Sequence, residues 1–335
     1  KPTGEAVALG ERVLTNVSFM RAGGFSVSEN GALVYQSTGG TGTARLMWSD
    51  RAGRQTAVVD ERLQYRDLRL SPDGTRAAVS LVSARDDTSD VWVIGARGLR
   101  TRLTFDATDD VSAIWSPEGT DVVFSSSRTG RHNLFRKAVS GADREDVLLD
   151  DPMDKLASSW SSDGKFLLYS IFDARTGPDV WVLPLTGDRQ PRAFLATAAD
   201  ERFARFSPDG RWVAYSSSES GLSEVYVARF PGPGGRGGVS RAGGGYPRWR
   251  SDGQELFYQS PDNRLMAAAL RVGSDRIEVE GEQPLFEMRA PDGYLRDFYD
   301  VASDGQRFML IVPDETTSNP LTLVSSWPTL LKARN

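Results

Sequence analysis

The sequence predicts an all-β protein, a seven-bladed β-propeller with four antiparallel strands per blade. Three observations lead to this prediction. A Ser-Pro-Asp-Gly-like signature recurs along the chain, short runs of β-branched and aromatic residues follow each copy, and no segment has the length and period of a helix. Four short strands in every ~40–45 residues are typical of propeller blades.

The signature is the clearest repeat. Five strong copies and two weaker ones occur, at 70–74, 115–119, 160–164, 206–210 and 249–253, and at 27–31 and 301–305. Their glycines are separated by 43, 45, 45, 46, 43 and 52 residues, so seven copies predict seven blades. Proline presets φ for a turn, Asp fits the next position and Gly allows a positive φ. We therefore interpret the recurring acidic residues as turn residues and not as catalytic groups or metal ligands.

Strand-like runs follow the signatures in chain order. Second strands are predicted at 77–79, 122–124, 166–169, 212–215 and 255–258, and third strands at 46–48, 91–94, 133–135, 180–183 and 225–227. Fourth strands are illustrated by 101–104 and 282–286. We expect a single domain over 1–335, made of a closing strand in 1–20 and blades at 21–60, 61–106, 107–150, 151–197, 198–241, 242–290 and 291–335.

Closure of the ring is predicted from the two ends of the chain. The last repeat supplies three runs, at 300–301, 307–311 and 321–324, and lacks a fourth. The run 12–17 precedes the first signature and has no blade of its own. Because an open ring would expose strand edges, we expect this N-terminal strand to complete the last blade, three strands plus one.

Composition excludes several function classes. With 40 Lys and Arg against 45 Asp and Glu, the formal charge of −5 provides no basic field for nucleic acid. The absence of Cys excludes disulfides and thiol nucleophiles, and His132 is the one histidine. No G-x-S-x-G or phosphate-loop motif occurs. We predict no catalytic residue and no cofactor. Acidic pairs such as Asp150-Asp151 offer oxygen ligands to Ca²⁺, but no EF-hand spacing is present.

The candidate binding site follows from propeller topology. Linkers that enter the first strand of each blade converge on one mouth of the channel, and binding sites in ring-shaped β folds gather where loops converge. The predicted ligand-binding residues are Tyr65, Arg66, Asp109, Asp110, Asp154, Lys155, Glu201, Arg202, Tyr246 and Arg296. The alternative is that these are ordinary solvated linker charges, which every propeller carries.

The signatures, together with runs such as 90–93, 102–106, 179–185 and 224–227, resemble the TolB-type, WD40-like propeller repeats of bacteria. More narrowly, 206–258 and the ending 326–332 are similar to the propeller attached to bacterial transmembrane serine/threonine protein kinases. This resemblance implies an extracytoplasmic, periplasmic sensor portion, not inserted in the membrane itself but tethered through a membrane helix that precedes it. No kinase signature occurs in the chain.

Three hypotheses for the function follow. The first is a non-catalytic sensory propeller that binds a small molecule, glycan or peptide at the channel mouth, or a protein partner. The second is a stand-alone periplasmic interaction propeller similar to TolB, although the small α/β domain typical of that protein is missing. The third is an enzyme, either a carboxylate-driven glycan hydrolase or lyase or a detached peptidase propeller. We expect the first, since the recurrent residues belong to the scaffold.

Overall fold

The computed structural model divides the chain into two compact units. The residues it describes are 25–28, 32–36, 43–83, 85–86, 88–141, 144–232, 234–290, 297–314 and 321–325. Thr43–Pro291 and Arg296–Pro313 form the main unit. Lys1–Gly42, Asp292–Leu295 and Asp314–Asn335 are assigned to the terminal unit. The run 12–17, predicted as a closing strand, lies outside the described residues.

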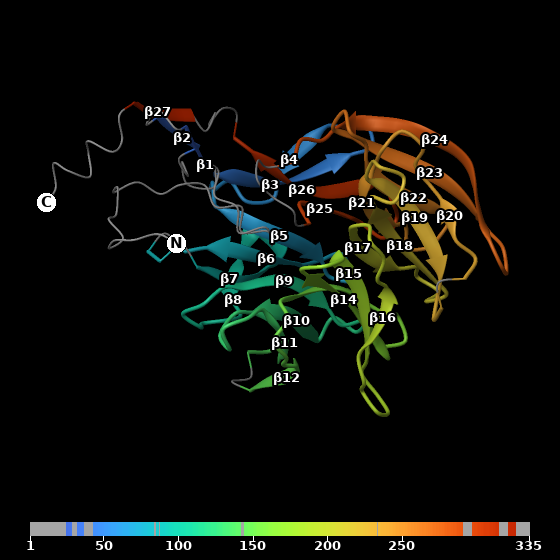
Figure 1. Ribbon diagram of the computed structural model, residues 1–335, viewed down its shortest axis with the longest axis horizontal. Helices are drawn as coiled ribbons and strands as arrows, with labels where there is room; N and C mark the ends of the chain where they lie inside the picture. The colour runs from blue at the N-terminus through green and yellow to red at the C-terminus, as the bar shows by residue number, and fades with distance from the viewer. Residues whose placement is uncertain are drawn as a thin grey trace, which may run out of the picture. The chain divides into compact units, whose positions relative to one another are not determined.

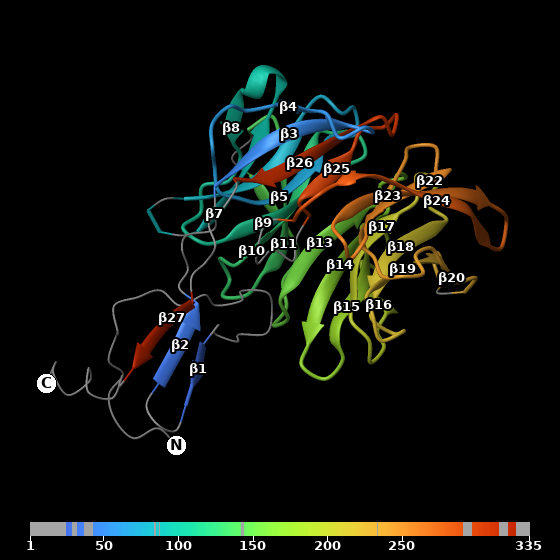
Figure 2. The same cartoon turned by 90° about the horizontal axis from the view of Figure 1, so that it is seen from above.

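The main unit is a β-propeller of antiparallel sheets with four strands each (Figures 1 and 2). Five of its blades are continuous in sequence. They consist of β5 (Tyr65–Leu70), β6 (Ala77–Val82), β7 (Ser89–Ile94) and β8 (Arg100–Arg102); β9 (Asp110–Trp115), β10 (Asp121–Ser126), β11 (Asn133–Ala138) and β12 (Glu145–Leu149); β13 (Lys155–Trp160), β14 (Phe166–Asp173), β15 (Gly177–Pro184) and β16 (Arg192–Leu195); β17 (Glu201–Phe206), β18 (Trp212–Ser217), β19 (Glu224–Arg229) and β20 (Gly237–Gly238); and β21 (Gly245–Trp249), β22 (Glu255–Gln259), β23 (Arg264–Val272) and β24 (Ile277–Glu287). A short 3-10 helix, η1 (Ala96–Gly98), precedes β8.

The sixth blade closes the ring from both ends of the main unit. Its order is β25 (Tyr299–Val301), β26 (Arg307–Pro313), β3 (Ala44–Asp50) and β4 (Gln55–Ala57). Seven residue pairs join β26 to β3, from Arg307 opposite Asp50 to Pro313 opposite Ala44. The closing blade therefore takes two strands from each end of the main unit. The prediction of three strands from the C-terminal repeat and one from the N-terminus was wrong in the strands that it paired. The run 46–48, expected in a first blade, lies instead in this closing blade.

The remaining strands belong to the terminal unit. They are β1 (Phe25–Val27), β2 (Ala32–Gln36) and β27 (Leu321–Ser325), in the order β1-β2-β27. The run 321–324 thus pairs with β2 and not with the closing blade, because β26 already has β25 on one side and β3 on the other. The described residues hold six four-stranded blades, so the predicted count of seven is not confirmed. The division of 1–335 into one domain with seven blades stays a prediction.

The signature residues form turns, as their chemistry predicts. The Ser71 hydroxyl donates to Asp73 Oδ1 at 2.5 Å and accepts from the Arg76 N–H at 3.0 Å. The amide of Gly74 donates to the Ser71 carbonyl at 2.8 Å, with φ of 68° at the glycine. Ser207 and Asp209 repeat this arrangement. In both turns, a residue of the signature takes part in each of these hydrogen bonds.

The hydrophobic core lies between neighbouring blades. Buried residues of adjacent sheets pack together, for example Val180 and Phe194 from one blade with Val213 and Tyr215 from the next. The first strands contact one another in ring order, β5, β9, β13, β17, β21, β25 and again β5. Side chains on these six strands therefore surround the axis of the propeller. Among the described residues, no helix has the length and hydropathy needed to cross a membrane.

Candidate functional site at the propeller axis

Four predicted site residues occupy one equivalent position. Tyr65, Asp110, Lys155 and Glu201 are the first residues of β5, β9, β13 and β17. Each is almost fully buried, with 1%, 0%, 0% and 1% of its surface exposed. They were predicted as linker residues at an open mouth. In the folded chain Asp110, Lys155 and Glu201 each form an ion pair or hydrogen bond with a nearby side chain. The buried Tyr65 hydroxyl has no hydrogen-bond partner among the described residues. Whether they bind a ligand stays a prediction.

The two buried carboxylates at this position have local partners. Asp110 lies 3.3 Å from Arg128 Nη2. Glu201 accepts the hydroxyl of Thr197 and, at 3.4 Å, the Thr197 N–H. Burial raises the pKa of both carboxyl groups. Such contacts tie the start of a strand to an adjoining loop.

Lys155 and Asp154 also bond within their own surroundings. Lys155 Nζ donates to Asn133 Oδ1 at 2.7 Å and forms an ion pair with Asp151 at 2.6 Å. Asp154 accepts the His132 N–H at 2.9 Å, and its carboxylate lies 3.1 Å from Arg131 Nη1. The hydrogen bond from the His132 side chain lowers the pKa of Asp154. The single histidine thus acts as a partner of this loop carboxylate.

The other predicted site residues lie in different settings. Asp109 accepts the Ser89 N–H at 2.9 Å, Arg66 is half-buried, and Arg296 lies outside the described residues. Arg202 pairs with Asp200 at 2.9 Å. The ring of Tyr246 packs on that of Phe203 with centroids 4.1 Å apart, and burial raises the Tyr246 pKa to about 12.

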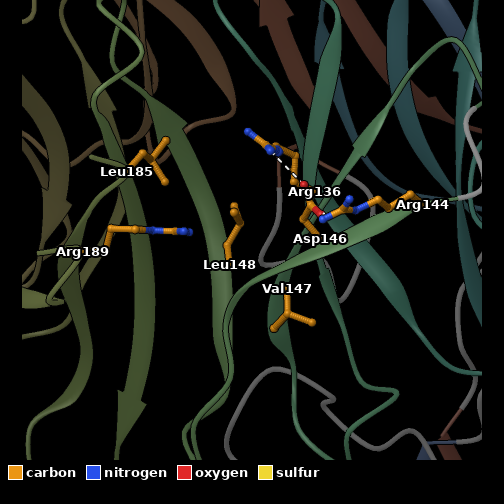
Figure 3. A pocket seen from close by; sticks show the side chains of 7 residues that line it. All are labelled: Arg136, Arg144, Asp146, Val147, Leu148, Leu185 and Arg189. Atoms are coloured by element: carbon orange, nitrogen blue, oxygen red, sulfur yellow. Dashed lines mark hydrogen bonds and ion pairs between the residues drawn. The ribbon is translucent and has the colours of Figure 1, made fainter. Parts of the chain in front are cut away.

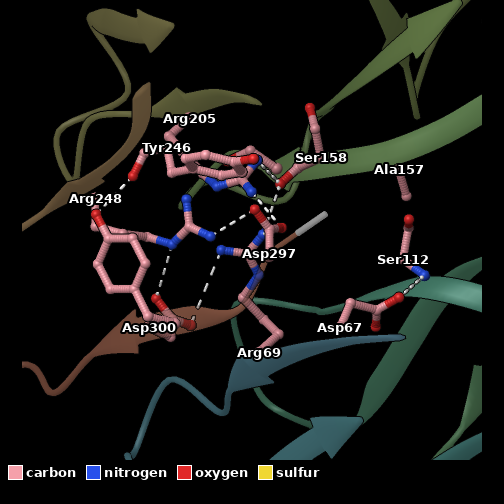
Figure 4. Close-up of polar contacts among 12 residues, drawn as sticks. Asp67, Arg69, Ser112, Ala157, Ser158, Arg205, Tyr246, Arg248, Asp297 and Asp300 are labelled. Atoms are coloured by element: carbon pink, nitrogen blue, oxygen red, sulfur yellow. Dashed lines mark hydrogen bonds and ion pairs between the residues drawn. The ribbon is translucent and has the colours of Figure 1, made fainter. Parts of the chain in front are cut away.

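The most concentrated charge lies where first strands from several blades meet (Figure 4). We call this set the axial cluster; it consists of Arg69 (β5), Arg205 (β17), Arg248 (β21), Asp297 and Asp300 (β25). Asp297 Oδ2 receives the guanidinium groups of Arg69 and Arg205, and Asp297 Oδ1 lies 2.6 Å from Arg248 Nη2. Asp297 thus has an arginine from each of three blades around one carboxylate.

Asp300 and backbone carbonyls complete the axial cluster. Asp300 Oδ1 lies 3.3 Å from Arg248 Nε, and Asp300 Oδ2 accepts the Leu70 N–H at 2.9 Å. Arg205 Nη1 donates to the carbonyls of Ser158 and Ala204. Tyr299 lies under the Arg248 guanidinium, 5.1 Å from it, and donates its hydroxyl to the Tyr246 carbonyl at 2.6 Å. Tyr246 therefore borders the axial cluster.

Burial and like charges shape the protonation of the axial cluster. Burial lowers the pKa of Arg205 well below its usual value, and the nearby Arg69 lowers it further. Burial alone would raise the pKa of Asp297, but the three arginines hold it below its usual value. The Asp297 carboxylate is thus ionised at neutral pH. Guanidinium groups in such a setting bind and orient anions.

Sequence reasoning missed the axial cluster, although a signal existed. Each first strand has an equivalent position one residue before its end, set by pairing with the second strand. Around the ring it holds Arg69, Ile114, Ser159, Arg205, Arg248 and Asp300. Four charged residues at this repeat position could have been noticed by aligning the copies. That the three arginines share Asp297 could not be predicted, because Asp297 precedes β25 and reaches them only through the ring geometry.

A polar depression lies between the outer parts of two blades (Figure 3). It has a volume of about 380 Å³ and is lined by Arg136, Arg144, Asp146, Val147, Leu148, Leu185 and Arg189. Arg136 and Arg144 both pair with Asp146, at 2.8 and 3.0 Å. In the part of the chain that the structure describes, no group of three or more His, Asp or Glu side chains is placed to hold a metal ion.

Comparison with known proteins defines the class. Residues 26–176 match the family model of the TolB beta propeller domain, PD40. The fold is similar to that of TolB from Agrobacterium tumefaciens, with a TM-score of 0.66 and 15% identity over 83% of this chain and 100% of that one. TolB from Acinetobacter baumannii gives 0.52 and 14% over 87% and 79%. Residues 26–176 thus match TolB-type repeats, so the resemblance to these repeats is confirmed, and the solved structures show that the fold is shared.

One curated relative points toward a different kind of protein. The Bacillus subtilis (strain 168) protein named "Uncharacterized peptidase YuxL" is 27% identical over 169 residues, which are 49% of this chain. The match covers 23% of the length of that relative. The shared portion is thus less than a quarter of the peptidase.

Proposed function

We propose that this chain is a non-catalytic binding propeller whose ligand is held at the axial cluster. The observation that carries the proposal is the convergence of five charged side chains, from four blades, on one buried place. Binding sites in ring-shaped folds gather where elements converge on a rigid scaffold. The three arginines and Asp300 are held by strands, and they form a preorganised set of donors and acceptors with Asp297.

Equivalent positions in the other blades support this proposal. Ile114 and Ser159 occupy on β9 and β13 the position that holds arginine on β5, β17 and β21. The scaffold therefore tolerates an apolar or small residue there, and the charges are not required by the repeat. Departures from local rules at a few positions are typical of functional sites.

A thermal-shift screen of the full chain against sugars, metabolites and short peptides tests the proposal, because selective binding raises the melting temperature by mass action. We expect at least one compound to raise the melting temperature of the wild-type chain but not that of Arg248→Met. The same compound should still raise the melting temperature of Arg144→Met, a control variant that alters the outer depression. If no compound in a broad panel shifts the melting temperature, or if shifts survive Arg248→Met, this assignment of the site is wrong.

The attachment of the propeller is a further part of the proposal. The similarity of 206–258 and 326–332 to kinase-attached propellers supports a role as the extracytoplasmic sensor portion of a bacterial serine/threonine kinase. The coding sequence upstream tests this directly. A kinase domain and one membrane span there would support it, whereas their absence would favour a stand-alone periplasmic propeller similar to TolB.

The peptidase relative supports a second candidate, the propeller of a larger peptidase. A hydrolysis assay separates this candidate from the non-catalytic propeller. Fluorogenic peptides of varied sequence are incubated with the full-length gene product and, separately, with the purified chain. Hydrolysis by the full-length product alone would assign the chain to a peptidase, and hydrolysis by the purified chain would contradict a non-catalytic propeller.

A further inference from the structure

The charges of the axial cluster do not balance. Three guanidinium groups, from Arg69, Arg205 and Arg248, lie within ion-pair distance of two carboxylates, Asp297 and Asp300. A third carboxylate in the same view, Asp67, accepts the Ser80 hydroxyl at 2.8 Å and the Ser112 N–H at 2.8 Å. One positive charge among the paired groups is therefore left over, in a place where burial makes it costly.

Donors are also left over within the axial cluster. Among the described residues, the Nε groups of Arg69 and Arg205 are buried and have no hydrogen-bond partner. The Arg205 side chain is 7% exposed. Buried guanidinium donors without partners are rare in folded proteins unless something else satisfies them. The three arginines thus have more positive charge and more donors than Asp297 and Asp300 satisfy, so another carboxylate can compete with Asp297 for them.

The arrangement around Asp297 shows which anion would fit. Each oxygen of this planar carboxylate lies against guanidinium groups, two on Oδ2 and one on Oδ1. Fork-shaped guanidinium groups match a carboxylate because its two oxygens are spaced like their N–H groups. Solvent reaches the place, since the side chains of Arg69 and Asp297 are 11% and 15% exposed.

We infer that the axial cluster is a binding site for the carboxylate group of a small organic acid, with Asp297 as its intramolecular competitor. The inference deepens the proposed function and rests on it. In the ligand-free chain Asp297 partly neutralises the three arginines. A ligand carboxylate takes up their donors, and the Asp297 side chain turns toward solvent while its backbone carbonyl keeps its bond to the Leu68 N–H at 2.9 Å.

Calorimetric titration of the full chain with succinate, in a buffer without carboxylates and at low salt, tests the inference. We expect saturable binding of succinate and none of succinamide, its uncharged counterpart of the same shape. Because Asp297→Asn removes the competing charge, we expect it to bind succinate at least tenfold more tightly. Arg205→Met should abolish binding, and Arg189→Met, in the outer depression, should leave it unchanged.

The comparison of succinate with succinamide uses the wild-type chain alone, so it tests the inference even where a variant of the axial cluster fails to fold. Folding of each variant is checked by circular dichroism. Equal binding of succinamide, loss of binding in Arg189→Met, or weaker binding by folded Asp297→Asn would each overturn the inference. An Asp-containing tripeptide that binds when succinate does not would assign the site to a protein segment instead. If a neutral compound binds through Arg248 while succinate does not, the inference fails and the proposed function stands; if nothing binds, both fail.

Discussion

Glu255 receives both terminal nitrogens of Arg51, at 2.7 and 3.0 Å. Arg51 follows β3 in the closing blade, and Glu255 begins β22 in the neighbouring blade. Arg51 also donates to the Gly305 carbonyl at 3.0 Å, in the turn between β25 and β26. One side chain thus joins the two halves of the closing blade and fastens that blade to the next one.

Removing the charge of Glu255 should destabilise the propeller. We expect Glu255→Gln to lower the free energy of unfolding by about 1–2 kcal/mol, because a two-pronged, largely buried pair loses its charge-assisted bonds. The comparison is Arg54→Gln, whose ion pair with Asp50 is exposed and should contribute little. Urea unfolding midpoints measure both. Equal midpoints for the two variants would show that the Arg51–Glu255 pair does not secure closure.

The signature glycines should differ in their tolerance of alanine. Gly74 has φ of 68° and open space around an added Cβ, so Gly74→Ala should cost about 1 kcal/mol, from backbone conformation alone. Gly305 has φ of 67°, and an added Cβ would lie 2.7 Å from Arg250 Cδ. Gly305→Ala should therefore lower the melting temperature further than Gly74→Ala. If Gly305→Ala lowered the melting temperature no further than Gly74→Ala, Arg250 would have moved aside at no cost in stability.

Acid should weaken the loop that holds Asp154. The His132 hydrogen bond lowers the pKa of Asp154 in the folded chain below its ordinary value of 3.8. Its contribution to stability is therefore complete above that ordinary value, and it is lost as the pH falls through the lower folded value. In Asp154→Asn the acid limb of the stability profile should be shallower than in wild type. Asp188→Asn, at an exposed position, serves as the control and should leave the acid part of the stability profile unchanged. An unchanged acid part in Asp154→Asn would contradict the stabilising role of Asp154.

Closure by two strands from each end can be tested by truncation. A chain of residues 43–313 keeps β3 with its seven pairs to β26, and we expect it to unfold cooperatively. A chain of residues 58–313 lacks β3 and β4 and leaves an edge of β26 unpaired, so it should be unfolded or aggregated. Circular dichroism and calorimetry measure both. Cooperative unfolding of the shorter chain would show that closure does not depend on β3.

Local chemistry made much of the scaffold predictable. The residue types in Ser207-Pro208-Asp209-Gly210 dictate a turn, and the runs on either side have the length and composition of strands. The strands of the blade β17–β20 consequently fall where the repeat places them. The site was harder to predict. Lys155 and Glu201 carry charges in entering segments, which suggested exposure, yet both are buried because the first residue of the strand already lies inside the ring.

The sequence by itself determined the all-β class, the turns and the four-stranded blade, since these depend on residues close together in the chain. The tertiary structure decided which strands from the two ends share a sheet, because β26 can pair with β3 or with another run of similar composition, and only packing selects between them. It also decided that Arg69, Arg205 and Arg248, 136 and 43 residues apart in sequence, meet at one carboxylate. Distances across the axis follow from ring geometry, which no local pattern encodes.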